Sequence, residues 1–252
     1  MFRKRYHALA FESDKQQERL LTHLDHFRTR DLDGRILFGG RQAWYPSAYQ
    51  RQRGCGPTTA ANMLAYLAHR PGFVSLYPPY LEASRAQYNI QDEHVFAQAG
   101  YLHFMQMLWR QLRPSLIGLF RPQRFATEIA FFARRHGVGF KTDIFGIYPW
   151  QRRHRRRFRR LVQFIQLGLA QDLPLAMLLY TRGQVREIQG QHWVTVVGIR
   201  PNADMSQAQL LVLDHGQARE FSLDCWFYTA QGGGAFVRLT QPQAFADPES
   251  KR

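Results

Sequence analysis

Cys55 has the strongest chemical setting in this sequence, because it precedes a predicted helix start within Gly54-Cys55-Gly56-Pro57. Free N–H groups and the helix dipole at such an end stabilise an anion, which favours the thiolate and lowers the pKa of the thiol. The flanking glycines remove side chains that would block access to the sulfur, and proline costs no hydrogen bond in the first turn. The setting favours a nucleophile over the alternative, a buried cysteine that only fills apolar space.

A cysteine nucleophile needs a base, and His192 opens a strongly β-patterned segment at 192–199. Asp214 ends the next predicted strand, 209–214, and a hairpin between the two strands would return it beside His192. A carboxylate at that point would orient the imidazole, which singles out Asp214 among the acidic residues. The alternative for His192 is a purely structural histidine, and its coupling to Asp214 favours the catalytic interpretation.

Other residues of these types have weaker settings. Cys225 has neither glycine neighbours nor a predicted helix start, so we expect it in the core. His215 lies in a glycine turn and is expected to point to solvent. His23 and His26, three positions apart, are typical of the solvated face of an amphipathic helix, so the sequence predicts no metal site and no cofactor.

Helical patterns dominate the first part of the chain and strand patterns the second. Helices are predicted at 13–29, from Pro57 to the Pro71-Gly72 stop, and at 92–112, 122–135 and 156–170. An early strand or turn is predicted at 33–40, and later strands at 174–180, 192–199, 209–214, 218–223 and 234–239. Helices followed by hairpin-linked strands indicate an α+β fold, with a helical N-terminal half packed on a mostly antiparallel β-sheet.

Together these segments resemble the papain-like cysteine peptidases, most closely the bacterial C39-like peptidases. The resemblance consists of a glutamine before a Cys-Gly-Pro helix start, a strand that begins His-Trp, and a following strand that ends in Asp. The separation of 137 positions between Cys55 and His192 falls in the interval of about 130–150 typical of papain-type enzymes. The resemblance implies one papain-like domain at 1–240, with an extension at 1–50, a helical half at 51–135, a sheet half at 136–240 and a flexible tail at 241–252.

By this resemblance, Cys55 attacks the carbonyl of a peptide or amide substrate, His192 acts as general base and acid, and Asp214 orients His192. Gln50 would help the Cys55 N–H to bind the oxyanion, although its spacing departs from the family pattern, and Gln52 is the alternative. Hydrolysis of the thioester by water makes a peptidase-like hydrolase. Attack by an amine would make an acyltransferase or transpeptidase with the same triad.

The chain of 252 residues has 34 basic and 19 acidic residues, and 30 of the basic residues are Arg, giving a formal charge of +15. Seven arginines gather at 152–160, a pattern that indicates a solvated basic loop or a site for an anionic or acidic partner. A non-catalytic protein binding through this surface is a third hypothesis, but no RRM, zinc-finger or helix-turn-helix signature indicates nucleic acid. The candidate anion-binding residues are Arg152, Arg153, Arg155, Arg156 and Arg157.

Composition sets the broad class. Two cysteines exclude a disulfide-rich scaffold and a cysteine-only zinc site. No apolar run reaches the ~18 residues that span a bilayer, and the basic first residues lack the apolar segment of a signal peptide. With 45% apolar residues, the chain can bury a substantial core, so we expect a globular, cytoplasmic protein with reduced thiols.

Overall fold

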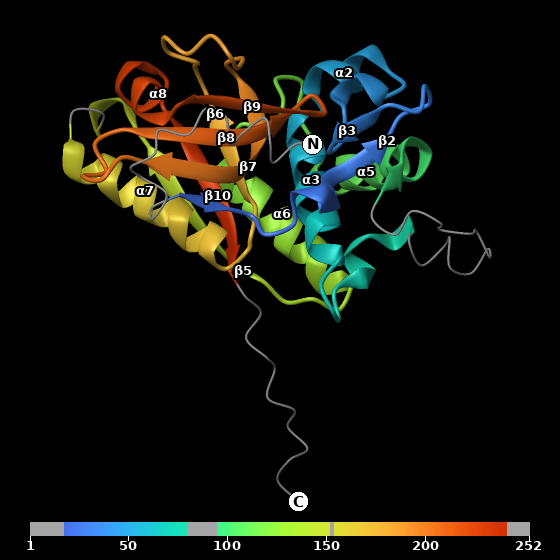
Figure 1. The fold of residues 1–252 in the computed structure, drawn as a ribbon. Helices are drawn as coiled ribbons and strands as arrows, with labels where there is room; N and C mark the ends of the chain where they lie inside the picture. The colour runs from blue at the N-terminus through green and yellow to red at the C-terminus, as the bar shows by residue number, and fades with distance from the viewer. Residues whose placement is uncertain (1–17, 80–94, 152–153, 241–252) are drawn as a thin grey trace, which may run out of the picture.

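The computed structural model of the chain describes residues 18–79, 95–151 and 154–240 (Figure 1). These residues form an α+β fold. The α-helices are α2 (Ala48–Arg53), α3 (Cys55–Ala68), α5 (Gln98–Leu112), α6 (Pro122–Arg135), α7 (Arg155–Ala170) and α8 (Leu223–Thr229). The strands are β1 (Arg19–Leu20), β2 (Arg28–Arg30), β3 (Ile36–Phe38), β4 (Phe96–Ala97), β5 (Lys141–Ile147), β6 (Leu175–Leu179), β7 (His192–Pro201), β8 (Ala208–Asp214), β9 (Gln217–Ser222) and β10 (Gly234–Thr240).

The main sheet is antiparallel throughout. Its strand order is β5-β10-β6-β7-β8-β9, and β1 adds to β7 through the pairs Arg19–Ile199 and Leu20–Gly198. The three-stranded sheet β3-β2-β4 is separate and contains one parallel pair, β2 with β4. Among the described residues, no helix combines the length and apolar character needed to cross a membrane.

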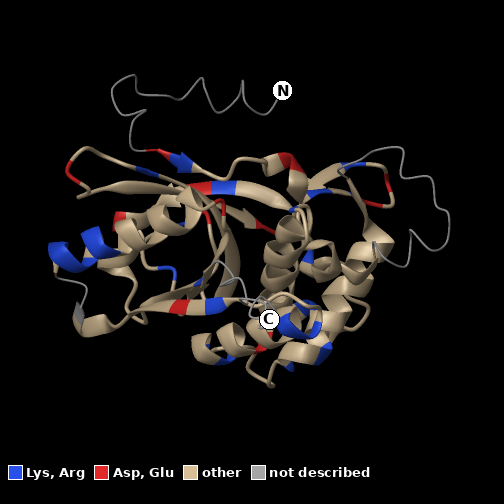
Figure 2. Ribbon diagram, turned by 90° about the horizontal axis from the view of Figure 1, so that it is seen from below, with Lys and Arg blue, Asp and Glu red and all other residues tan. Residues whose placement is uncertain are grey.

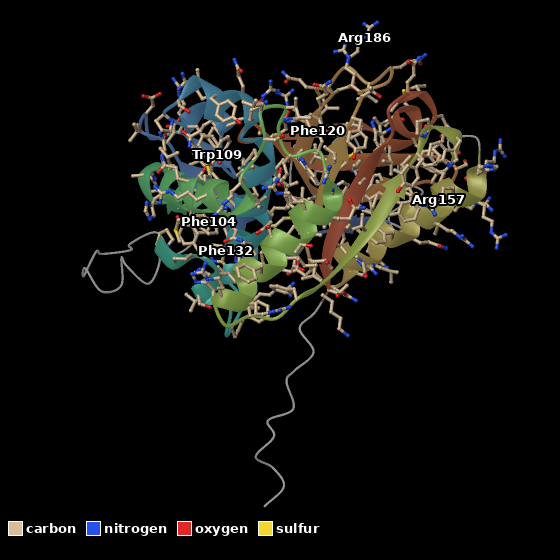
Figure 3. The ribbon with its side chains drawn as sticks, turned by 180° about the vertical axis from the view of Figure 1, so that it is seen from behind. Phe104, Trp109, Phe120, Phe132, Arg157 and Arg186 are labelled. Carbon is tan, nitrogen blue, oxygen red and sulfur yellow. The ribbon has the colours of Figure 1, made fainter. Side chains whose placement is uncertain are left out.

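Two groups of helices cover the main sheet. All five residues of β6 are buried, and successive side chains of a strand point to opposite faces, so both faces are covered. Both α3 and α7 contact β6 and β7 and supply this cover. In the helical part, Phe104 of α5 and Phe132 of α6 lie with ring centroids 6.0 Å apart (Figure 3).

Helix α3 is buried on every side, with all 14 of its residues in the core. A helix surrounded in this way carries little amphipathic pattern, and its small residues allow neighbours to approach closely. It contacts α5, α6 and β7, so it joins the helical half to the sheet (Figure 1). The residues at its N-terminus are therefore held by both halves of the molecule.

The predicted helix at 13–29 is wrong over its described part. Residues 18–29 form β1, a 3-10 helix at Leu24–Phe27 and the start of β2, while residues 13–17 lie outside the described part of the chain. The apolar residues of this segment do not form one buried helix face, since Leu21 and Phe27 are buried but Leu20 is exposed. Pairing of Arg19 and Leu20 with β7 satisfies backbone groups that a helix would have bonded internally.

The other predicted elements agree more closely with the structure. Helix α6 spans the predicted 122–135, with Pro122 at its first position and Gly137 at φ 79° after its end. The strands predicted at 174–180, 192–199, 209–214, 218–223 and 234–239 differ from β6 to β10 by two residues or fewer at each end. The third predicted helix, 92–112, begins only at Gln98, because Phe96 and Ala97 form β4, and residues 92–94 lie outside the described part. Strand β5 and the short helices α2 and α8 were not predicted, and the tail at 241–252 also lies outside the described part.

Residues 18–50 pack against the helices and the main sheet. The hydrogen bond from Leu21 N to Val197 O continues the contact of β1 with β7. Thr29, in β2, is fully buried and donates its hydroxyl to Gly39 O. This part of the chain therefore belongs to the same core as the helices and the sheet.

Candidate active site

Cys55 is the first residue of α3 and has 9% of its surface exposed. The N-cap residue, Gly54, has no side chain to bond the N–H groups of the first turn. The sulfur instead interacts with the backbone N–H groups of Gly56 and Trp193. The start of α3 thus supplies one hydrogen-bond donor to the sulfur, and the start of β7 supplies the other.

The two glycines around Cys55 serve packing as well as access. A Cβ at Gly54 would collide with the ring of Tyr45, and one at Gly56 would come within 3.0 Å of Leu119 Cδ2. Gly54 has φ −82°, so it is not required here by a left-handed backbone. These glycines let the neighbouring side chains close around the start of α3.

His192 lies between Cys55 and Asp214. Its Nε2 is 2.7 Å from Asp214 Oδ1. Because a carboxylate only accepts hydrogen bonds, Nε2 carries a proton and donates a hydrogen bond to Asp214. The Cys55 thiol is the other side-chain hydrogen-bond partner of His192, which leaves Nδ1 as the ring nitrogen for that contact. The structure thus brings the three residues selected from the sequence into one chain of hydrogen bonds.

The β7–β8 hairpin positions Asp214 beside His192. Thr195 in β7 pairs with Leu213 in β8, so the end of β8 returns to the start of β7. His192 and Asp214 are each 6% exposed. Burial in a strand pair restricts both side chains and keeps the carboxylate in reach of the imidazole.

Trp193 fixes the beginning of β7 to the helical half. Its indole Nε1 donates to Leu119 O, and its ring stacks on Phe125 of α6 with centroids 4.3 Å apart. The buried indole therefore has both a hydrogen-bond partner and an aromatic partner. Because His192 directly precedes Trp193, this anchor also locates the imidazole relative to Cys55.

The electrostatics favour a thiolate paired with an imidazolium. Burial raises the pKa of Cys55, but the hydrogen bond and charge of His192 and the two backbone N–H groups outweigh it, so the pKa lies below its usual value. Burial lowers the pKa of His192, but Asp214 and Cys55 raise it to about 10. The ion pair therefore exists at pH values between the pKa of Cys55 and that of His192.

Asp214 is surrounded by positive or neutral donors. Burial raises the pKa of Asp214, but its contacts with His192, and the charges of His215 and Arg219, lower it below the usual value. Arg219 Nε lies 3.3 Å from Asp214 Oδ2, on the opposite carboxylate oxygen from His192. The carboxylate is thus ionised and available to His192 across the neutral range.

His215 does not point to solvent as expected. Its ring stacks on the His192 ring with centroids 5.2 Å apart and an interplanar angle of 16°. Its Nε2 lies 3.6 Å from Asp214 Oδ1, and its side chain is about one-third exposed. The turn after β8 is short enough to fold the ring back over the hairpin, which the glycine pattern alone did not reveal.

Asn62 links three parts of the site and was missed by the sequence reasoning. Its Oδ1 accepts hydrogen bonds from Gly40 N and Tyr101 Oη, both at 2.9 Å, and its Nδ2 donates to Thr195 Oγ1 at 3.0 Å. A Cβ at Gly39, where φ is 78°, would lie 2.6 Å from Asn62 Oδ1. A polar residue on a fully buried helix was the available signal.

Gln42, rather than Gln50 or Gln52, lies next to Cys55 in the recess. Gln42 is buried and donates from Nε2 to Arg51 O. Gln50 lies in α2, where its Oε1 contacts Ser47 Oγ, and neither Gln50 nor Gln52 is among the residues that line the recess. Gln42 precedes Cys55 by 13 positions, with α2 between them, so the glutamine at the recess lies outside the spacing that selected Gln50 and Gln52.

A small recess with a cavity volume of about 10 Å³ lies over these groups. It brings the Cys55 sulfur, the His192 imidazole and the Gln42 amide to one surface. The lining residues are Gly40, Gln42, Cys55, Thr58, Thr59, Asn62, His192, Trp193, Leu213, Asp214 and His215.

The arginine cluster lies away from this recess, at the start of α7 (Figure 2). Arg152 and Arg153 fall outside the described residues, and Arg155 and Arg156 are exposed. Arg157 instead turns against β5, where its guanidinium lies 4.1 Å from the Phe145 ring centroid and donates to Gly146 O (Figure 3). One of the five candidate anion-binding residues is therefore used in packing, and an anionic partner stays a prediction.

Two groups in the described residues place three metal-ligand atoms within 4.8 Å of one another. In His23, Asp25 and His26, the two imidazoles stack with an angle of 14°, unlike ligands that converge on an ion. In His192, Asp214 and His215, Arg219 already occupies one carboxylate oxygen and its charge opposes a cation. Hydrogen bonding explains the second group better than metal binding.

No protein-family model matches this chain, and no curated protein matches it. Among solved structures, UfSP from C. elegans is similar over 46% of this chain and 22% of that chain, with 15% identity and a TM-score of 0.30. A likeness at this level carries no argument about activity. Any functional conclusion therefore depends on the geometry of the site.

Proposed function

We propose that the protein is a cysteine peptidase-like hydrolase that cleaves a peptide or amide bond through Cys55, His192 and Asp214. The observation that carries this proposal is the connected set of contacts at the start of α3, in which a buried cysteine faces a histidine held by a buried carboxylate. The cysteine helix precedes the histidine and aspartate strands, which is the order that the resemblance to papain-like peptidases implies. These features support a thiol nucleophile over a packing cysteine.

In this mechanism the Cys55 thiolate attacks the substrate carbonyl carbon and forms a C–S bond, and the carbonyl oxygen becomes an oxyanion. His192 gives its Nδ1 proton to the leaving amine as the C–N bond breaks, leaving a thioester on Cys55. His192 then takes a proton from water as the water oxygen attacks the thioester carbonyl carbon. The C–S bond breaks, which releases the acid product and restores the Cys55 thiolate beside the His192 imidazolium. Asp214 accepts a hydrogen bond from the Nε2–H of His192 throughout and keeps the ring oriented.

Gln42 is the proposed oxyanion donor, together with the N–H of Cys55. Its amide has two N–H donors, and one bonds Arg51 O, so the other is available to a substrate oxygen in the recess. Donors fixed in advance stabilise the developing charge without reorganisation. The hydrogen bonds of Asn62 to Gly40 and Thr195 hold the segment before Gln42 against α3 and β7.

The pH dependence of alkylation tests the thiol chemistry. In a Cys225→Ala background only Cys55 reacts with iodoacetamide, and its rate should already be high below the usual titration range of a thiol. His192→Ala removes the positive charge that stabilises the Cys55 thiolate, so the pKa of Cys55 should rise. The alkylation rate at pH 6 should then fall by at least about tenfold. An unchanged rate profile in His192→Ala would overturn the proposed function.

Hydrolysis of the bound acyl group separates the hydrolase from an acyltransferase. A peptide library incubated with the protein, without any added amine, should yield carboxylic acid products identified by mass spectrometry. The hydrolysis rate should rise through the pKa of Cys55 and fall as His192 loses its proton near pH 10. A thioester on Cys55 that is released only by an added amine would identify a transferase instead.

A further inference from the structure

The turn that follows Asp214 has an unusual first residue. Asp214 pairs with Gln217, so the β8–β9 loop consists of His215 and Gly216 alone. Both have positive φ, 49° and 77°, which defines a two-residue type I′ hairpin turn. Such turns favour Asn-Gly, so a histidine at the first position is not what the backbone alone would select.

Gly216 is required where it stands. Its φ is left-handed, and a Cβ would come 2.7 Å from Arg41 Cγ. Its carbonyl also accepts a hydrogen bond from Phe38 N, which fastens the turn to β3. The turn is therefore held on two sides, and the side chain of His215 is presented from a fixed backbone.

The His215 ring packs on His192 from this turn. The rings are nearly parallel, 16° apart, with centroids 5.2 Å apart, and His215 Nε2 is 3.6 Å from the Asp214 oxygen that accepts from His192. An imidazole held only by two end-on hydrogen bonds can still rock about the line that joins them. The His215 ring lies against the face of the His192 imidazole and opposes that motion.

The charges around His215 favour its neutral form. The groups that face it are His192 from β7, Asp214 from β8, Arg219 from β9 and Arg41 from the segment before Gln42. Burial lowers the pKa of His215, and the positive charges of His192, Arg219 and Arg41 add to this, while Asp214 opposes it. A neutral ring can stack on the His192 imidazolium without charge repulsion.

We propose that His215 is a positioning residue that packs on His192 and keeps its imidazole between Cys55 and Asp214. This role rests on the proposed thiol chemistry of Cys55. Without His215, His192 spends less time in contact with the sulfur, and the thiolate loses part of its stabilising charge. The consequence is a higher pKa for Cys55.

The test is His215→Asn, which removes the ring but suits a type I′ turn better than histidine. In the Cys225→Ala background, the variant should keep or exceed the melting temperature of its parent. The pKa of Cys55, measured from iodoacetamide rates and from thiolate absorbance, should rise by about one unit, so the rate at pH 6 falls about tenfold. Near pH 10.5 the thiol is ionised in both proteins, and the two rates should converge.

His215→Gly is the second variant, because Gly-Gly also fits this turn and likewise lacks the ring. If both variants keep the parent's pH profile, the positioning role is overturned. The positioning role is also overturned if the alkylation rate falls by the same factor at every pH and the melting temperature falls as well. That result would indicate a structural role for His215. His192→Ala distinguishes the two proposals, since an unchanged profile there removes the thiol chemistry itself, whatever His215 does.

Discussion

Cys55 and Cys225 both lie in the first turn of a helix, yet their surroundings differ. Cys55 begins α3 after a glycine without a side chain, and its sulfur meets two backbone N–H groups and His192. Cys225 is the third residue of α8, where Ser222 Oγ accepts a hydrogen bond from its backbone N–H at 3.0 Å. Within the described part of the chain, no hydrogen bond reaches the Cys225 sulfur.

The comparison shows that a helix start alone does not make a nucleophile. In α8 the free N–H is used by a serine cap, which stabilises the helix. In α3 the cap is missing, and the sulfur takes the place of the capping oxygen. The second requirement is an opposite charge, and His192, raised in pKa by Asp214, provides it only at Cys55.

The largest effect is expected from exchanging the two cysteines for alanine in turn. Cys55→Ala removes the attacking atom and should lower peptide hydrolysis by at least about 10⁴-fold. Cys225→Ala should leave the rate unchanged, and both variants should remain folded by circular dichroism. Equal losses in the two variants would remove the distinction between the cysteines.

The next effect concerns the oxyanion. Gln42→Ala removes a donor to the developing charge and should lower kcat for peptide hydrolysis about 10²-fold. The alkylation rate of Cys55 by iodoacetamide should stay the same, since no oxyanion forms in that reaction. Gln50→Ala is the matched control and should behave as the parent, because Gln50 contacts Ser47 outside the recess. A larger loss in Gln50→Ala than in Gln42→Ala would contradict the assignment.

A smaller effect is expected where α3 is joined to β7. Asn62→Ala removes three buried hydrogen bonds and should lower the free energy of unfolding by about 2 kcal/mol in urea titration. Tyr101→Phe removes only one of these bonds and should cost about 1 kcal/mol. Equal stability of Asn62→Ala and its parent would show that Asn62 does not hold the site together.

The smallest effect belongs to the capped helix. Ser222→Ala removes the cap of α8 and should lower the free energy of unfolding by about 1 kcal/mol. The alkylation profile of Cys55 should not change, because α8 does not touch the recess. A shifted pKa of Cys55 in this variant would mean that the two helix starts are coupled.

Sequence reasoning located the site through local signals. The glycines, the proline and the β-pattern after His192 were enough to place Cys55 on a helix start and Asp214 at the return of a hairpin. Gln42 could not be predicted from the sequence, because α2 lies between it and Cys55 in the chain. The spacing along the chain therefore does not reflect the distance in space. The stack of His215 on His192 depends on two left-handed residues, which a Gly turn permits but does not specify.

The fold shows the same division between local and non-local causes. Helix α6 has its proline, its apolar stripe and its terminal glycine in sequence, so its bounds were predictable. Residues 18–29 have a helical spacing of apolar residues, but Arg19 and Leu20 pair with β7 instead, and Leu20 is exposed while Leu21 and Phe27 are buried. Tertiary contacts overrode the local pattern there.

The complete burial of α3 also sets which parts of the site can move. Amide groups of a helix enclosed on all sides exchange hydrogen with solvent only when the whole molecule unfolds. We therefore expect the helix that carries Cys55 to be among the most slowly exchanging of the described elements. Any adjustment to a substrate must come from the chain around it, from the segment that carries Gln42 and from the turn that carries His215, where amide exchange should be faster.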